Sequence, residues 1–391
     1  MKESFIIVNA MVYRTEERDF LPGTVEVKNG VITSVVLGTD RDMKCVSSAD
    51  LPVIDAHGKY LVPGLVDVHT HGRIGYDFDS ADAAQMREMR ASYASDGTTT
   101  VLPTIASAPL DKIEHSIDCI KEVGFDGVHL EGRYLNVKRR GAHSPELLFP
   151  LGTEELTSLL DRMDPLPIKH ITCAAELEGG EAFVKTALSH GATVGIGHTD
   201  ATYEEAMNAI AWGVTSFTHT FNAMRPIHHR EPGVITAGLT TENAYCEAIA
   251  DGFHLHPAVI RLLYQAKKPD HLVLITDSMC AAKCPDGDYS IGGIKVFVRD
   301  GKAINVEGAI AGSTITLYTA VLNLMRFADI SFADALACAT INPARMTGLD
   351  ALTGSVAEGK RADLLIVDPE TYGITDIFAA GCRVPVSGTV Q

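Results

Sequence analysis

Residues 65–71 read LVDVHTH, an apolar strand pattern that runs into two histidines. Because side chains alternate along a β-strand, Asp67, His69 and His71 share one face and the valines share the other. Two imidazoles from one strand can therefore bind one metal ion. Alone the pattern is weak, because 15 histidines in 391 residues give an HxH by chance roughly 0.6 times. A second HxH does occur, at 254–256, and an isolated one is also typical of surface or capping histidines.

The chain that follows this stretch alternates between short apolar strands and helical patterns. Eight such units in about 290 residues predict an α/β fold, a (β/α)8 TIM barrel. A doubly wound sheet is the alternative, but no GxGxxG follows the first strand. The expected strands cover residues 65–69, 99–103, 127–130, 169–175, 193–196, 215–218, 246–250 and 272–276. The expected helices cover residues 81–95, 110–122, 153–163, 180–190, 201–212 and 257–267.

Both ends of the chain are rich in β-branched residues. Asn29-Gly30 is a strong hairpin signal between two of the expected strands. We therefore expect a small β-sandwich domain built from both termini, residues 1–60 and 347–391, beside a barrel at 61–346. A glycine-rich segment at about 278–313 should form a β-hairpin insertion over the barrel mouth. The expected terminal strands cover residues 4–13, 24–28, 31–37, 362–367 and 383–390.

Composition excludes several classes of protein. Lys plus Arg is 33 and Asp plus Glu is 50, so the net charge of −17 argues against a nucleic-acid partner. No apolar run approaches the roughly 20 residues of a membrane span, and no stretch near the N-terminus resembles a signal peptide. The eight cysteines include no C-x-x-C pair, which is typical of reduced, mostly buried thiols. We expect a soluble, cytoplasmic protein with no membrane partner.

Ligand-type residues follow four further strands of the expected barrel. Glu131, His198, His219 and Asp277 each come directly after an apolar strand, where a buried ionisable group is costly unless it is paired or metal-bound. Reactive groups of such barrels lie at these strand ends. Histidine and carboxylate are the ligands of hydrolytic zinc sites. The sequence therefore predicts a metal site with the first-strand histidines. Asp277 either caps a loop or transfers protons beside the metal, and its position favours the second.

Several motifs carry a resemblance to a known family. The stretches 62–71, 342–345 and 359–364 resemble the metal-dependent amidohydrolase superfamily. More specific stretches resemble the N-acetylglucosamine-6-phosphate deacetylases within it, so the resemblance runs nearly end to end. It implies a zinc-dependent removal of acetate from an amino-sugar phosphate, with iron or manganese as other candidate metals, and a homodimer. The specific stretches are 129–132, 141–143, 197–203, 218–224, 230–233 and 250–254.

The resemblance also implies residue roles. Glu131, His198 and His219 would be the main metal ligands, and Asp277 the proton-transferring acid. His143 would polarise the acetyl carbonyl and, with Ala142, contact the sugar. The remaining substrate contacts would be Asn222, Ala223, Arg230, His254 and Gly312, some of them reaching across a dimer interface.

Three departures from the family pattern have consequences. Arg133 stands where the family commonly has proline, which would reshape the loop or offer the substrate a cation. His69 and His71 are both present, so one or two ions remain possible. The fourth strand has no lysine near its C-terminal end, so Glu131 would have to bridge two ions.

Other functions stay open. The substrate could be the galactosamine epimer, a cyclic amide or an N-acylamino acid, and a metal-free scaffold is the non-enzyme alternative. The cations at 228–230 would supply an anion site. They are also compatible with a solvated loop.

Overall fold

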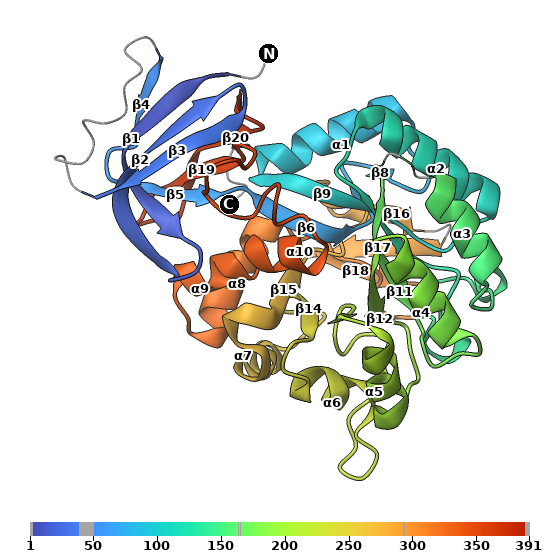
Figure 1. Ribbon diagram of the computed structural model, residues 1–391. Coiled ribbons are helices and arrows are strands. Elements are labelled where there is room, and N and C mark those ends of the chain that lie inside the picture. The colour runs from blue at the N-terminus through green and yellow to red at the C-terminus, as the bar shows by residue number, and fades with distance from the viewer. Residues whose placement is uncertain (1–2, 39–50, 163, 165, 292–293, 388–391) are drawn as a thin grey trace.

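The computed structural model describes residues 3–38, 51–162, 164, 166–291 and 294–387. Its centre is a sheet of eight parallel strands in the order β15-β14-β13-β12-β11-β10-β9-β6, and β15 also contacts β6, so the sheet closes into a barrel (Figure 1). This confirms the TIM barrel and excludes the doubly wound sheet. The strands are β6 (Leu65–Thr70), β9 (Thr98–Ile105), β10 (Val128–Glu131), β11 (Ile168–Cys173), β12 (Thr193–Ile196), β13 (Ser216–Phe217), β14 (Tyr245–Ile249) and β15 (Leu272–Ile275).

Helices cover the outside of the barrel, and local sequence sets where several begin. Thr202 and Glu205 form a reciprocal capping box, which begins α5 just after the loop that carries His198. Lys268, before Pro269, has non-helical backbone angles and kinks α7. The helices are α1 (Ala83–Ser95), α2 (Leu110–Val123), α3 (Thr153–Arg162), α4 (Gly180–Ser189), α5 (Tyr203–Trp212), α6 (Gly233–Thr240), α7 (Pro257–His271), α8 (Leu317–Ala328), α9 (Phe332–Ala337) and α10 (Ile341–Met346). Met163, the expected end of the third helix, lies outside the described residues.

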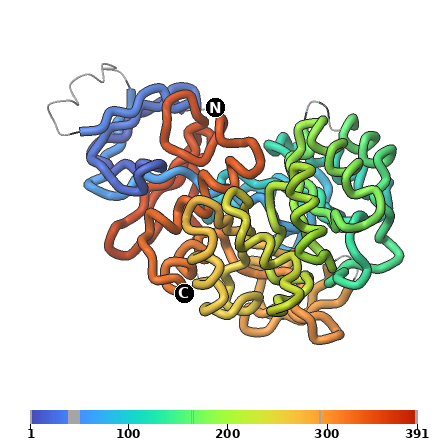
Figure 2. Tube along the Cα trace, turned by 60° about the horizontal axis from the view of Figure 1, so that its bottom comes forward, coloured from blue at the N-terminus to red at the C-terminus, as the bar shows by residue number. Residues whose placement is uncertain are grey.

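The two ends of the chain meet in a separate mixed sheet, as expected. Figure 2 shows the first and last segments, blue and red, side by side at one flank of the barrel. Inward side chains such as Phe5 and Phe378, whose rings lie 4.8 Å apart, form a core of their own. The division at residues 60 and 347 stays a prediction. The strands are β1 (Phe5–Arg14), β2 (Asp19–Lys28), β3 (Val31–Leu37), β4 (Val53–Asp55), β5 (Tyr60–Pro63), β19 (Leu364–Val367), β20 (Ile374–Ala379) and β21 (Cys382–Val384).

Turn chemistry explains two boundaries of this sheet. Asn29 and Gly30 both have positive φ angles, 51° and 78°, as a two-residue hairpin requires. The strand expected at 383–390 is wrong in its extent, because β21 ends at Val384. Pro385 follows, and proline has no N–H to continue a strand ladder. Residues 388–390 lie outside the described residues.

A small antiparallel sheet interrupts the chain between β15 and α8. It contains β16 (Gly287–Ile291), β17 (Ile294–Arg299) and β18 (Lys302–Asn305). Asp300 and Gly301 form the turn between β17 and β18, with φ angles of 50° and 72°. The insertion therefore has three strands, and residues 292–293 lie outside the described part.

Two composition-based expectations can be compared with the fold. Within the described ranges, no helix is long and apolar enough to cross a membrane. Cys119, Cys173, Cys246 and Cys338 are buried free thiols, whereas Cys45 lies outside the described residues. The cytoplasmic location stays a prediction.

Candidate active site

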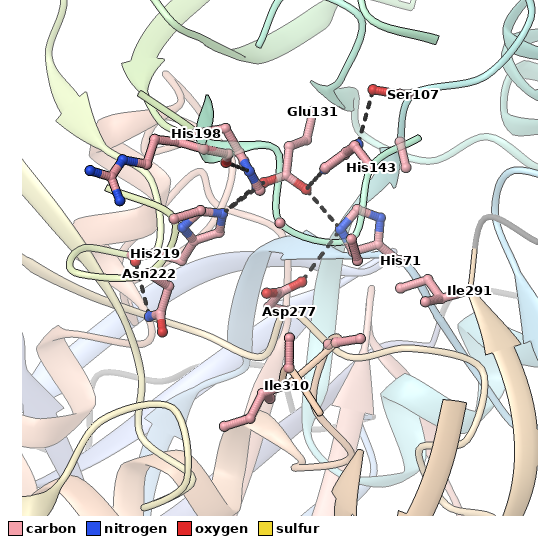
Figure 3. Close-up of a pocket in the computed structure, with 18 of the residues that line it drawn as sticks. His71, Ser107, Glu131, His143, His198, His219, Asn222, Asp277, Ile291 and Ile310 are labelled. Atoms are coloured by element: carbon pink, nitrogen blue, oxygen red, sulfur yellow. Dashed lines mark hydrogen bonds and ion pairs between the residues drawn. The ribbon is translucent and has the colours of Figure 1, made fainter. Parts of the chain in front are cut away.

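The carboxylate of Glu131 lies at the centre of the histidine cluster (Figure 3). Its Oε1 atom is 2.9 Å from His219 Nε2 and 3.3 Å from His198 Nε2. Its Oε2 atom is 3.0 Å from His71 Nε2 and 3.2 Å from His69 Nε2. The five side chains come from four strand ends of the barrel, so the fold brings together all five predicted metal ligands.

The backbone is unusual at three strand ends of the barrel, including the one after β15. His198, His219 and Asp277 have positive φ angles of 46°, 31° and 47°, a region that non-glycine residues seldom adopt. Such conformations persist where the surrounding structure enforces them, and they concentrate at functional sites. No local sequence pattern indicates this conformation.

Acceptor groups fix the proton positions on two of the imidazoles. His198 Nδ1 lies 2.9 Å from the carbonyl oxygen of Arg139, which can only accept, so Nδ1 carries a proton and Nε2 is the ring atom turned toward the cluster. This Nε2 atom faces Glu131 Oε1 and lies 3.0 Å from His219 Nε2. Similarly, His69 Nδ1 lies 3.2 Å from a carboxylate oxygen of Glu247. His69 Nε2 is buried and forms no hydrogen bond within the described part of the chain.

These donor atoms fit a divalent cation. Ligand atoms of a tetrahedral zinc ion stand about 3.3 Å apart, given Zn–N distances near 2.05 Å. The distances among Glu131 Oε1, His198 Nε2 and His219 Nε2 run from 2.9 to 3.3 Å. His69, His71 and Asp277 form a second group able to hold a cation. His143 also lies near Glu131, but at 3.9 Å and with its other nitrogen on Ser107, so His219 is the better ligand.

Electrostatics bind the cluster together as well. Burial raises the pKa of Glu131, but the charge of His69 and hydrogen bonds from His198 and His219 outweigh it and lower that pKa well below its usual range. At His71, burial lowers the pKa, but hydrogen bonds to Asp277 and Glu131 outweigh it and raise the pKa to about 10. Positive charge is therefore strongly favoured here. A divalent cation would supply it in place of these protons, so cation binding should release protons.

A cavity of about 490 Å³ opens above the cluster. Its lining includes most of the substrate contacts that the sequence predicted, and it adds Ser107, Lys138 and Ile291, which the sequence reasoning missed. Lys138 supplies an exposed cation at the rim. The predicted residues in the lining are Ala142, His143, Asn222, Ala223, His254, Asp277 and Gly312.

Arg230 is the predicted contact that the chain does not bring to this cavity. It lies in an exposed loop, where its Nη1 atom is 2.8 Å from His229 Nε2, and it is absent from the described lining. Its assignment to the substrate stays a prediction. His69 also lies outside the lining, because it is fully buried beneath Glu131.

A short hydrogen-bond chain positions His143. Ser107 Oγ accepts the backbone N–H of Arg133 at 2.8 Å and lies 2.9 Å from His143 Nδ1. Gly132 permits this approach, because a Cβ there would stand 2.3 Å from Ser107 N. Burial and then the charge of His198 lower the pKa of His143 to about 3, so its ring is neutral near pH 7.

The side chain of Arg133 points away from the substrate cavity. Its guanidinium forms two 3.0 Å bonds to the Glu155 carboxylate and lies over the Phe149 ring. The backbone of Arg133 has a positive φ of 66°. Arg133 in place of proline was expected either to reshape the loop or to offer the substrate a cation. The geometry agrees with the first expectation and not with the second.

Comparisons with known proteins agree with this site. A sequence profile of the amidohydrolase family matches residues 60–390. N-acetylglucosamine-6-phosphate deacetylase from Vibrio furnissii is 34% identical over 79% of each chain, and N-acetylgalactosamine-6-phosphate deacetylase from Escherichia coli O157:H7 is 33% identical over 84% of this chain and 89% of that one. A solved structure of N-acetyl-D-glucosamine-6-phosphate deacetylase from Mycobacterium smegmatis, a mutant in complex with N-acetyl-D-glucosamine-6-phosphate, is 30% identical. It superposes with a TM-score of 0.89 over 98% of this chain and 99% of that one.

These matches confirm the resemblance seen in the sequence motifs. The chain belongs to the amidohydrolase family, in the branch that contains these deacetylases.

Proposed function

We propose that this protein hydrolyses the acetamide of N-acetylglucosamine 6-phosphate, releasing acetate and glucosamine 6-phosphate. The observation that carries the proposal is the position of Glu131 between four imidazoles at the floor of a cavity. The wall of that cavity carries His143, Asn222 and His254. Family relatives named as deacetylases of this substrate add support.

Glu131, His198 and His219 would hold one divalent cation, with zinc as our first candidate. His69 and His71 would hold a second beside Asp277. When bound, such a cation polarises an amide carbonyl and makes hydroxide available near neutral pH.

Asp277 is placed to handle the protons of the reaction. Its Oδ1 lies 3.4 Å from His71 Nε2, and its side chain reaches the cavity. The carboxylate accepts a proton from the attacking water and passes it to the amine nitrogen as the C–N bond breaks. Burial raises its pKa, but the hydrogen bond with His71 and the neighbouring charges lower it to about 2, so it begins as the base.

His143 is placed to donate to the acetyl carbonyl oxygen. Because Ser107 Oγ accepts from Arg133 N–H, its own hydrogen is available for His143 Nδ1. We assign the neutral ring a proton on Nε2, the nitrogen on the Glu131 side. That N–H would stabilise the negative charge that develops on the carbonyl oxygen.

The phosphate would bind at the other end of the cavity, near Asn222, Ala223 and His254. Lys138 adds a cation within the chain. We propose that Arg230 joins them from a second copy, so that the active form is a homodimer. This would explain why a residue expected at the phosphate lies in an exposed loop.

N-acetylgalactosamine 6-phosphate is the second candidate substrate. It differs from the first only in the orientation of one hydroxyl, and a relative of similar identity carries that name. Initial rates with both epimers at equal concentration decide between them.

The direct test is to incubate purified, metal-analysed protein with N-acetylglucosamine 6-phosphate and to measure acetate. We expect acetate and free amine in equal amounts, and far slower release from the unphosphorylated sugar. No acetate from either epimer, with metal bound, would reject the proposal. Preferred cleavage of cyclic amides or N-acylamino acids would assign another amide hydrolase.

A further inference from the structure

Tyr93 is a buried tyrosine on α1 that neither the sequence motifs nor the reaction above uses, and it is 3% exposed. Its hydroxyl oxygen lies 2.6 Å from Thr70 Oγ1 and 3.1 Å from the carbonyl oxygen of Gly72. Ser278 Oγ lies 2.7 Å from the same Thr70 atom and 2.9 Å from the same carbonyl oxygen. Three hydroxyl groups, from α1, from the end of β6 and from the segment after β15, therefore meet at one buried point.

These contacts lie directly behind groups of the candidate site. Thr70 separates His69 from His71, and Ser278 follows Asp277. The carbonyl oxygen of Ser278 accepts the backbone N–H of His71 at 2.8 Å, and the N–H of Asp277 donates to the His69 carbonyl oxygen at 2.8 Å. The backbone that carries Asp277 is thus joined to the end of β6. Asp277 has a positive φ of 47°, which the surrounding structure has to enforce.

Each of the three hydroxyl groups has one proton to donate, and the Gly72 carbonyl oxygen can only accept. Thr70 Oγ1 makes the two shortest contacts, so it donates in one and accepts in the other. The hydrogen bonds therefore run in one direction through Tyr93, Thr70 and Ser278, in either order, and end on that carbonyl oxygen. Loss of the Tyr93 hydroxyl would leave Thr70 Oγ1 with one of these two partners and break the chain.

The tyrosine ring is itself held in place. The guanidinium carbon of Arg73 lies 4.3 Å from the ring centroid, and the Phe78 ring packs nearly parallel to it at 6.4 Å. Arg73 Nη2 is 2.5 Å from one carboxylate oxygen of Asp96, and Lys283 Nζ is 3.0 Å from the other. Burial raises the pKa of Tyr93 to about 12, so the hydroxyl keeps its proton near neutral pH. A fixed ring on a helix therefore presents a fixed hydroxyl group to two strand ends.

We propose that Tyr93 is a positioning residue, whose hydroxyl fixes the segment after β15 against the end of β6 and so holds the Asp277 carboxylate where it exchanges protons. The proposal rests on the proton-transfer role proposed above and adds the group that places it. Tyr93 is not among the described residues that line the cavity. The substrate contacts Asn222 and His254 follow other strands, so loss of the hydroxyl should lower kcat and leave KM almost unchanged.

The test replaces Tyr93 by phenylalanine, which removes one oxygen atom and keeps the ring. With N-acetylglucosamine 6-phosphate we expect kcat to fall about 10- to 100-fold and KM to change less than about twofold, with the metal content of wild type. Tyr13→Phe is the matched control. Tyr13 is 1% exposed, and its hydroxyl donates to the carbonyl oxygen of Ala333 at 2.7 Å, but it lies on β1 of the terminal sheet. Equal kcat values in the two variants would overturn the proposal.

Thr70→Val gives a second variant, which keeps the shape of the side chain and loses the hydroxyl. Because the three hydroxyl groups act as one chain, the double variant with Tyr93→Phe should be little slower than Thr70→Val alone. Losses of kcat that multiply would contradict this coupling. Thr70→Ser restores the hydroxyl and should recover most of the activity lost in Thr70→Val.

Amide hydrogen exchange, followed by mass spectrometry, gives a readout that needs no turnover. The N–H groups of His71 and Gly72 both donate to Ser278. A peptide that spans residues 69–75 should therefore exchange faster in Tyr93→Phe than in wild type or in Tyr13→Phe. Exchange as slow as in wild type would overturn the proposal. Wild-type protein that releases no acetate, with exchange still faster in Tyr93→Phe, would instead reject the proposed function alone.

Discussion

The histidines of this site differ mainly in the group that each contacts through its Nδ1 atom. His69 Nδ1 donates to the Glu247 carboxylate and His198 Nδ1 donates to the Arg139 carbonyl oxygen, which leaves the Nε2 atom of each ring for a cation. His143 differs, because its Nδ1 atom contacts the Ser107 hydroxyl, a group that can donate as well as accept. Three imidazoles within one cluster therefore have different kinds of partner at Nδ1. Their chemistry follows from their hydrogen-bond partners, since the rings themselves are identical.

Replacement of Asp277 by asparagine should separate metal binding from proton transfer. The amide keeps the shape of the side chain but cannot accept a proton from water. We expect kcat to fall about 10²- to 10⁴-fold, with the metal content close to wild type. Parallel kinetics and elemental analysis check this. Turnover near wild type with a full metal site would count against Asp277 as the proton carrier.

Replacement of Ser107 by alanine should disturb His143 without touching the metal ligands. The ring would lose its Nδ1 partner and its fixed orientation, and we expect kcat to fall about 10- to 100-fold. Ser107→Thr retains the hydroxyl and should recover most of the activity.

The pH dependence provides a second measurement of His143. Because burial lowers the pKa of His143 to about 3, its ring stays neutral as pH falls through 6.5. NMR titration of wild type should therefore show no His143 ionisation between pH 5 and 8. A titration near 6.5 would contradict this assignment.

The residues that the sequence could and could not reveal differ in how they act. Glu131, His198, His219 and Asp277 stand directly after apolar strands, and barrel geometry brings such positions together. Ser107 contacts His143, which lies 36 positions away in the sequence, and Glu247 contacts His69, which lies 178 positions away. No local pattern marks such contacts, because they exist only once the strands are adjacent.

At the scale of elements, the strands were easier to predict than the helices. All eight barrel strands lie where apolar β-branched runs indicated them, with shifts of a few residues at their ends. The helix α6 (Gly233–Thr240) was not predicted, because its sequence GVITAGLT is poor in residues that favour helices. Burial of Val234 and Ile235 against the barrel stabilises it instead, so tertiary packing overrides local propensity.

The loop after β10 provides a test at this scale. Arg133 has a φ of 66° and donates its N–H to Ser107, whereas proline fixes φ near −65° and has no N–H. Arg133→Pro should therefore lower the free energy of unfolding by more than about 1 kcal/mol, measured by urea denaturation.

Arg133→Gly is the matched control for this loop. Glycine keeps the N–H and the positive φ but removes the ion pair with Glu155, so it should leave His143 in place and kcat closer to wild type. If the proline variant were as active and stable as wild type, the Ser107 contact would not hold this loop.

At the scale of the whole molecule, one chain forms the metal cluster but leaves Arg230 outside its own cavity. A two-fold dimer has self-complementary contacts, so a loop of each copy can reach the cavity of the other. Arg230→Ala should then raise KM for the phosphorylated sugar far more than for the unphosphorylated one. The same change in both KM values would remove the phosphate contact from the proposal.

Mixed dimers test whether Arg230 acts across an interface. An Arg230→Ala chain keeps its own Asp277, and an Asp277→Asn chain still offers Arg230 to its partner. When the two impaired variants are unfolded, mixed in equal amounts and refolded, half of the dimers should be mixed, and each should hold one intact site. At substrate concentrations well below the raised KM, about one quarter of wild-type activity should return. If Arg230 served its own chain, no mixed dimer would hold an intact site, and activity would stay at the average of the two variants. Each variant refolded alone is the control.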